Sequence, residues 1–174
     1  MKYLVKFFVV TSIVLFCTAV SAEQKIVILD LKYVLNNSKA GKGAQDYLKK
    51  SFSNNAKKFN NMENDLKKEE KDLLAKKTIL SKDEYTKKID NLRKKVIDFQ
   101  SQRKSSIDKI ATQRAKSRDT LVKTIDPILE SYIKENNISL VVDKKFTLGG
   151  SPENDITKII IEKLNKELPS LDLK

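Results

Sequence analysis

Residues 48–80 read LKKSFSNNAKKFNNMENDLKKEEKDLLAKKTIL, and they carry the most regular apolar pattern in the chain. Large apolar residues recur in it at every seventh position, namely Phe52, Phe59, Leu66, Leu73 and Leu80. The companion positions lose their apolar character along the chain, in the order Leu48, Asn55, Met62, Glu69 and Lys76. Heptad spacing of this kind predicts a long helix that packs along one seam. The decay of the companion positions predicts looser packing toward the far end of that seam.

A second series of apolar residues at helical spacing follows, consisting of Tyr85, Ile89, Leu92, Val96 and Phe99. Between the two series, Ser81 and Glu84 have the spacing of a capping box, which marks the start of a helix. We therefore predict a first helix over about residues 44–80, a tight turn near 78–84 and a second helix. A short turn makes the two helices antiparallel, as an α-hairpin.

The interior of this hairpin lacks residues that break helices. No Gly or Pro occurs between Gly43 and Pro127, and these two residue types disfavour helix most strongly. Residues 100–119 are too polar for a globular core, so we expect that part of the second helix to be solvated or to face a wet cavity. We expect Pro127 to kink the helix or to make it restart.

Short strand candidates lie near both ends of the chain. Residues 25–31 (KIVILDL) and 139–143 (SLVVD) are apolar and rich in β-branched residues, as strands are, and 146–148 is a third candidate. Apolar residues at helical spacing in 153–168 predict an amphipathic C-terminal helix. The predicted fold class is α+β and mostly α, with a long helical hairpin arm on a small β body. Because so few short strands do not form a stable sheet alone, we expect several copies of the chain to complete it.

The N-terminus has the pattern of a secretory signal peptide. A basic start with Lys2 and Lys6 precedes an uncharged apolar run at 7–20, and small residues end at Ala22. The alternative, an uncleaved anchor helix, needs about 20 apolar residues, whereas this run has 14. We predict cleavage after Ala22 and export to the periplasm. The predicted organisation is a signal peptide at 1–22, a β-containing body formed by 23–43 and 126–174, and an arm at 44–125.

Basic charge is concentrated in the arm. Residues 49–125 hold 22 Lys and Arg against 11 Asp and Glu, whereas the rest of the chain after residue 22 holds 11 against 12. A charged run is often only a solvated helix face. An excess confined to one part of the chain creates a long-range field that attracts acidic partners. The charge therefore favours an acidic or anionic partner for the arm.

The residue inventory excludes several kinds of chemistry. The chain has no His, and its single Cys is Cys17 in the predicted signal peptide, which excludes Ser-His and Cys-His catalysis and zinc sites built from His or Cys. Asp30 and Asp143 end the two main strand candidates, where Asp more often caps or turns the chain than acts as an acid or base. Gly149-Gly150 lacks the rest of a phosphate-binding motif and indicates a turn. We predict that the protein is not an enzyme and uses no cofactor and no metal.

The order of these segments resembles the OmpH/Skp family of periplasmic chaperones. The resemblance rests on KIVILDLKYVL, the basic hairpin with MENDLKKEEKDL, the strand ISLVVDKKFTLGG and the helix SPENDITKIIIEKLNKE, and it covers about residues 24–168. It implies a homotrimer in which strands from three subunits form a small barrel and three helical hairpins project from it. It also implies that unfolded outer-membrane proteins are held between the arms without nucleotide.

This resemblance implies roles for two groups of residues. We expect client contacts from basic and apolar residues of the arm: Lys57, Lys67, Lys76, Lys87, Arg93, Lys94, Arg103, Met62 and Phe99. We expect the trimer body to be formed by strand residues: Ile26, Ile28, Leu29, Leu140, Val141 and Val142. Lipopolysaccharide or an anionic membrane surface is a further possible partner, because a family member has been associated with a basic lipopolysaccharide site on the arm.

Three other classes of function stay open at this point. A nucleic-acid-binding coiled coil fits the basic charge, but export argues against it and we expect no nucleic-acid partner. A structural envelope coiled coil would need heptads throughout the second helix, and residues 100–119 interrupt them. An envelope hydrolase would need a catalytic base, for which the sequence offers no candidate beyond the strand-end carboxylates.

Overall fold

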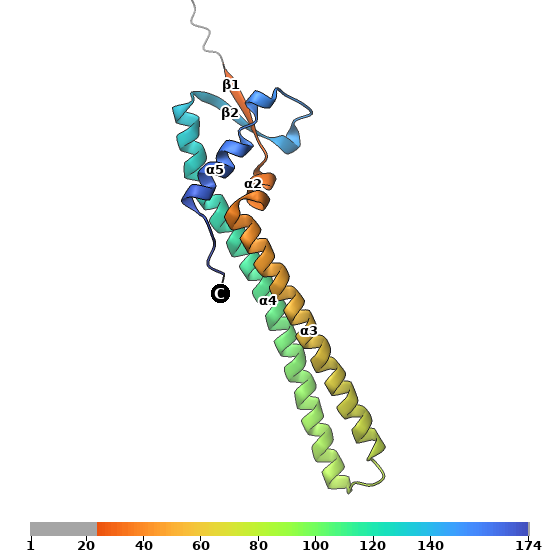
Figure 1. Cartoon of the computed structure of the whole chain (residues 1–174). Helices are drawn as coiled ribbons and strands as arrows, with labels where there is room; N and C mark the ends of the chain where they lie inside the picture. Colours follow the sequence, from red (N-terminus) through yellow and green to blue (C-terminus); the bar gives the residue numbers. More distant parts are fainter. Residues whose placement is uncertain (1–23, 174) are drawn as a thin grey trace, which may run out of the picture.

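The computed structural model describes residues 24–173 as a small body with one long arm (Figure 1). The predicted signal peptide at 1–22, with its cleavage point after Ala22, lies outside these residues. The described chain contains six main elements: β1 (Lys25–Leu29), α2 (Leu31–Asn37), α3 (Lys39–Ala75), α4 (Lys82–Glu135), β2 (Ile138–Asp143) and α5 (Thr157–Glu167). The predicted α+β class, mostly α, is confirmed. None of the described helices has a segment long and apolar enough to cross a bilayer.

Helix α3 begins earlier than the sequence indicated. We predicted a start near residue 44 because Gly41 and Gly43 suggested a break, but the Ser38 hydroxyl caps the helix by accepting from the Gly41 N–H at 3.1 Å. A Cβ atom at position 41 would lie 1.9 Å from the Leu35 carbonyl oxygen. Glycine is therefore needed here for the close approach of α2 to the first turn of α3, and it does not end a helix.

The turn at the tip of the arm begins sooner than expected. Helix α3 ends at Ala75, so Leu80, the last heptad position, lies in the connection and not in the helix. The predicted capping box is confirmed: Glu84 N–H donates to Ser81 Oγ at 3.3 Å, and Ser81 N–H donates to Glu84 Oε2 at 3.2 Å. The companion position Lys76 is exposed and Leu80 is only half-buried, so the last predicted turn of the first helix has little apolar packing to hold it.

Helix α4 runs through Pro127 without restarting. Proline removes one backbone donor and disfavours the helix interior, so our prediction expected a kink or a new start. Leu121 and Ile125 are almost fully buried just before it, and Ile128 and Leu129 pack on the same core just after it. Packing on both sides holds the helix across the proline, and α4 therefore belongs to the arm and to the body at once.

Strands β1 and β2 form a two-stranded parallel sheet, with Ile26 opposite Leu140 and Ile28 opposite Val142. The predicted third strand at 146–148 is wrong. The chain makes a 3₁₀ turn at Lys144–Phe146 instead, in which the Asp143 carboxylate accepts from the Lys145 N–H. The other edge of β1 receives a hydrogen bond from Ile156 N–H to the Ile28 carbonyl, at 2.9 Å.

The core lies in the body, between the sheet, α2, α5 and the C-terminal part of α4. Its buried residues are Val27, Leu29, Val34, Ala40, Leu121, Ile125, Ile138, Ile156, Ile160 and Leu164. The C-terminal tail after α5 adds Leu168 and Leu171 to this core. Figure 1 shows the tail returning along α4 toward the root of the arm. The body thus anchors both helices of the arm, and the rest of the arm extends away from it.

Candidate functional site

The middle of the arm is fastened by one aromatic pair. Phe59 of α3 and Phe99 of α4 meet edge to face, with ring centroids 6.1 Å apart and an interplanar angle of 69°. Each side chain is 8% exposed. Phe99 was among the residues expected to contact clients, and in the single chain it packs the hairpin instead. Met62, one turn from Phe59, is half-buried.

The predicted basic residues of the arm all point into solvent: Lys57, Lys67, Lys76, Lys87, Arg93, Lys94 and Arg103. Two of them form an ion pair with a residue of their own helix. Lys67 pairs with Glu63 on α3 at 2.7 Å, and Arg93 pairs with Asp90 on α4 at 3.2 Å. The hydrogen bond from Lys67 lowers the pKa of Glu63, and the nearby charges of Lys67 and Arg103 add to this effect. Exposed ion pairs of this kind contribute little to stability, so these side chains can exchange partners at low cost.

One ion pair joins the two helices of the arm. Lys95 of α4 reaches Glu69 of α3, with its Nζ atom 2.7 and 2.8 Å from the two carboxylate oxygens. Glu69 is one of the polar companion positions in the heptad pattern. At this position an ion pair between the two helices therefore replaces the apolar contact of a regular heptad seam. Because Phe59 lies opposite Phe99 and Glu69 lies opposite Lys95, residue numbers rise along α3 where they fall along α4, so the two helices run antiparallel.

Separate grooves lie between the helices of the arm and differ in character. The distal groove is lined mostly by apolar side chains, including Leu66, Leu73, Tyr85, Leu92 and Val96, and the exposed side chains Leu74 and Ile97 lie on it. A second groove, in the middle of the arm, is polar and is lined by residues such as Ser51, Asn54, Asn55, Ser101, Ser105 and Ser106. We had expected a solvated second helix over 100–119, and this polar stretch fits that expectation.

A third groove lies at the root of the arm, between α2, α3, α4 and the turn after β2. We call it the root groove, and it is lined by Asp30, Leu31, Lys32, Leu35, Asn36, Gly41, Ala44, Gln45, Asp46, Leu48, Lys49, Phe52, Ile110, Arg114, Ser117, Arg118, Leu121, Asp143, Lys144 and Lys145. Phe52 is 63% exposed in it. Sequence reasoning placed Phe52 in the buried heptad seam and did not single out Arg114 or Arg118. The polar residues at 100–119, which face that seam, were the signal that it could not be buried there.

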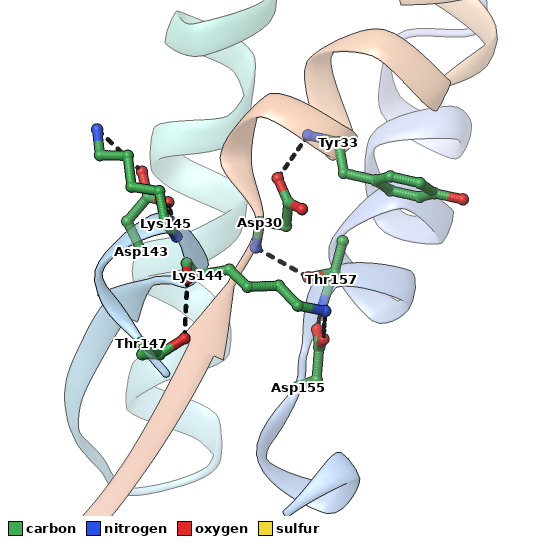
Figure 2. Close-up of polar contacts among 8 residues, drawn as sticks. All are labelled: Asp30, Tyr33, Asp143, Lys144, Lys145, Thr147, Asp155 and Thr157. Atoms are coloured by element: carbon green, nitrogen blue, oxygen red, sulfur yellow. Dashed lines mark hydrogen bonds and ion pairs between the residues drawn. The ribbon is translucent and has the colours of Figure 1, made fainter. Parts of the chain in front are cut away.

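A polar cluster locks the strand ends to the helices of the body (Figure 2). The Asp30 carboxylate caps α2 by accepting from the Tyr33 N–H at 2.8 Å, and the Asp30 N–H donates to Thr157 Oγ1 at 2.9 Å. Lys144 Nζ lies 2.8 Å from Asp155 Oδ2. Asp30 and Asp143 therefore act as capping residues, the role that the sequence favoured for both.

Hydrogen bonds shift the pKa values of Asp155 and Lys144 in this cluster. Partial burial alone would raise the pKa of Asp155, but hydrogen bonds from Lys144 and Thr157 outweigh it and hold that pKa below its usual value. The same hydrogen bond to Asp155, together with its charge, raises the pKa of Lys144. Both groups are thus held in their ionised forms, and they tie the turn after β2 to the start of α5.

The six strand residues expected to form a trimer body divide between two faces of the sheet. Leu29 and Val141 face the core of the same chain. Ile26, Ile28, Leu140 and Val142 share the opposite face, where Ile26 is 46% and Leu140 is 53% exposed. The turn beyond β2 adds two exposed side chains, Phe146 and Leu148, which the sequence suggested only as part of a third strand. The body therefore carries an uncovered apolar surface.

The family model for outer membrane protein (OmpH-like) matches residues 25–164, from β1 almost to the end of α5. The chain belongs to the OmpH-like family. The OmpH-like fold is also found in a crystal structure from Caulobacter crescentus CB15, of a protein described as an outer membrane chaperone (OmpH-like). The TM-score is 0.78 at 18% identity, and the match covers 87% of this chain and 89% of that one.

The resemblance to the OmpH/Skp family that the sequence indicated is thereby confirmed. No curated protein matches the chain significantly. The OmpH-like match spans β1, the whole arm and most of the body, so the exposed arm surface and the uncovered face of the sheet both belong to the part that defines the family.

Proposed function

We propose that this protein is an ATP-independent holdase chaperone of the periplasm, which binds unfolded outer-membrane proteins and prevents their aggregation. The observation that carries the proposal is the arm itself. It is a two-helix hairpin that exposes basic side chains along its length and carries apolar side chains in its distal groove and its root groove. Membership of the OmpH-like family, and the likeness in fold to a protein described as an outer membrane chaperone, support it.

The proposed mechanism is capture by many weak contacts. The charge of the arm speeds the encounter with acidic segments of a client, and apolar contacts hold the segments once they have arrived. Lys57, Lys76, Lys87, Lys94 and Arg103 have no ion pair within residues 24–173, which suits them to such contacts. No step of this mechanism needs nucleotide or a covalent reaction.

We further propose that the working form is a homotrimer that places three arms around a cavity. The apolar face of the sheet with Ile26, Ile28, Leu140 and Val142 would be covered in the assembly. An isolated two-stranded sheet is only marginally stable in water, so joining sheets from several chains removes a weakness of the single body. An alternative partner for the basic arm is the anionic surface of lipopolysaccharide or of a membrane, which carries the same sign of charge as an acidic client.

Refolding tests the chaperone proposal. An unfolded β-barrel membrane protein is diluted out of urea without nucleotide, with and without the chain lacking residues 1–22, and aggregation is followed by light scattering. We expect a stoichiometric amount of assembled chaperone to suppress the scattering. If the scattering is unchanged, the proposal is wrong. Anionic vesicles in place of the client test the alternative partner by co-sedimentation.

The mass in solution tests the assembly. We expect a trimer for the wild-type chain and smaller species for Leu140→Asp, because a carboxylate on the apolar face would be costly to bury. The control is Ile107→Asp, a similar change at an exposed position in the arm, which should leave the mass unchanged. A monomeric wild-type chain would exclude the trimer. Sequencing the N-terminus of the exported protein tests cleavage after Ala22.

A further inference from the structure

The root groove combines an apolar floor with a basic rim. Its volume is about 1300 Å³, and its floor includes Leu48 and Leu121, which are almost fully buried. Phe52 lies over this floor with most of its ring exposed. A groove of this size accepts a segment of several residues, and an aromatic ring exposed inside it is a surface that an apolar side chain can cover favourably.

The charges around the groove are unequal. Six basic and three acidic residues line it. Two of the acids are already used: the Asp30 carboxylate accepts from the Tyr33 N–H, and Asp143 pairs with Lys145. Asp46 is the remaining acid. On the basic side Lys144 pairs with Asp155, which lies outside the groove.

Four basic residues of the rim are left for an external partner, namely Lys32 on α2 and three residues on the two helices of the arm. Lys49, Arg114 and Arg118 have no ion pair within residues 24–173. Arg114 and Arg118 are four residues apart on α4 and both line the groove. Like charges at this spacing repel each other, and an anion between them would relieve the repulsion. Guanidinium groups also bind carboxylates through paired hydrogen bonds.

We propose that the root groove anchors the client chain by a segment in which an apolar side chain stands next to a carboxylate. The apolar side chain packs on Phe52, and the carboxylate lies among Lys49, Arg114 and Arg118. This inference rests on the proposed chaperone function and adds a defined site to it. The distal groove is less selective by charge, because Glu63 and Glu70 line it together with Lys67 and Arg93.

Two variants of the full assembly, without residues 1–22, test the site. Phe52→Ser removes the apolar contact, and Arg114→Gln with Arg118→Gln removes the charge. The matched controls are Ile107→Ser, which removes an exposed apolar residue elsewhere on the arm, and Lys116→Gln with Lys123→Gln, which removes two charges from α4 outside the groove. The probe is a fluorescently labelled, urea-unfolded β-barrel membrane protein. We expect about tenfold weaker binding for each test variant, as for the loss of one well-placed contact, and unchanged binding for the controls.

A pair of synthetic peptides separates charge from apolar contact. Both carry the same apolar residues, and one has aspartate where the other has asparagine. The aspartate peptide should bind the wild-type protein about tenfold more tightly. In the variant with Arg114→Gln and Arg118→Gln this preference should disappear, whereas in the control with Lys116→Gln and Lys123→Gln it should persist.

The outcomes distinguish this inference from the function on which it rests. If wild-type protein does not bind the unfolded client, the chaperone proposal itself fails. If it binds and the test variants bind equally tightly, only the root groove is excluded. If Phe52→Ser lowers the mass of the assembly, the groove is a contact between copies of the chain, and the inference is wrong.

Discussion

At the scale of single residues, two glycines in the first turns of α3 have opposite effects on stability. A Cβ atom at Gly41 would lie 1.9 Å from a backbone oxygen of Leu35, whereas a Cβ atom at Gly43 would meet nothing within 4 Å. The first glycine permits a close contact between two helices. The second only adds backbone freedom to the unfolded chain, which lowers stability.

We therefore predict opposite effects for two identical substitutions. Gly41→Ala should lower the free energy of unfolding by about 2 kcal/mol, because backbone atoms must move apart. Gly43→Ala should raise it by about 0.5–1 kcal/mol, since alanine is the better helix former. Urea unfolding of both variants measures the difference. Equal effects would mean that α2 does not approach α3 as closely as the structure has it.

The ion pair at the strand ends gives a pH dependence at the same scale. The pKa of Asp155 is lowered in the folded chain, since hydrogen bonds from Lys144 and Thr157 outweigh its partial burial. A lowered pKa stabilises the fold above the unfolded value of about 4, and this stabilisation is lost as the pH falls through the folded pKa. The pKa of Lys144 is raised in the folded chain. A raised pKa stabilises the fold at lower pH, so this stabilisation is lost only in strong base.

Asp155→Asn should therefore destabilise the body near neutral pH by about 1 kcal/mol, through weakened hydrogen bonds. The difference from wild type should shrink as the pH falls through the lowered pKa of Asp155, because the native carboxyl then becomes protonated as well. The measurement is urea unfolding at a series of pH values. The control is Glu153→Gln, a change at an exposed acid in the same connection. A difference that persists unchanged in acid would contradict the assignment.

At the scale of elements, much of the arm could be predicted from its spacing alone. The capping box at Ser81 and Glu84 and the two apolar series gave the hairpin, because heptads and caps are local signals. The start of α3 could not be found in this way, since the need for Gly41 comes from a contact with α2. The third strand was assigned wrongly because Phe146 and Leu148 are apolar, and only the cap made by Asp143 shows that the chain turns there.

The candidate site was less predictable than the fold. Exposed lysines follow from composition, but whether an apolar residue faces the seam or the solvent depends on the opposite helix. Phe59 meets Phe99 and is buried, whereas Phe52 lies alongside a polar stretch and stays exposed. Phe52 and Phe59 are both positions of the same heptad series, so the sequence pattern alone predicts the same burial for both.

We predict that the aromatic pair controls the stiffness of the arm. Phe59→Ala should cost about 3 kcal/mol locally, as for other buried aromatic residues, and should open the middle of the hairpin. Amide hydrogen exchange should accelerate in α3 and α4 around the pair, while the amides of the body keep their rates. Phe52→Ala is the matched control and should change little, because its ring is mostly exposed already. Uniform acceleration throughout the chain would contradict a local role.

At the scale of the whole molecule, charge and core are separated. The body holds the hydrophobic core and the ordered polar cluster, and the arm holds the excess of basic residues. Charges on the solvent-exposed arm interact with a partner over about 8 Å at physiological salt, and over longer distances when the salt is dilute. The arm can therefore attract a client without any change in the body.

The rate of client capture should depend on ionic strength. Raising the salt from about 20 mM to about 500 mM should slow association by about tenfold or more, because screening removes the attraction. Stopped-flow fluorescence with labelled client measures the rate. Lys57→Gln with Lys94→Gln on the arm should reduce this salt dependence, whereas Lys158→Gln with Lys166→Gln in the body should not. A rate that is indifferent to salt would remove electrostatics from the mechanism.

The parallel pairing of β1 with β2 has a consequence for how the chain folds. Ile26 pairs with Leu140, and the entire arm lies between them in the sequence. Contacts at such separation form slowly, whereas hairpin contacts close to the turn form quickly. As the chain emerges N-terminus first, β1 has no strand partner within the chain until the last quarter of the sequence arrives. The arm of the nascent chain should therefore form before the body. Until β2 is synthesised, the apolar strand β1 should remain exposed.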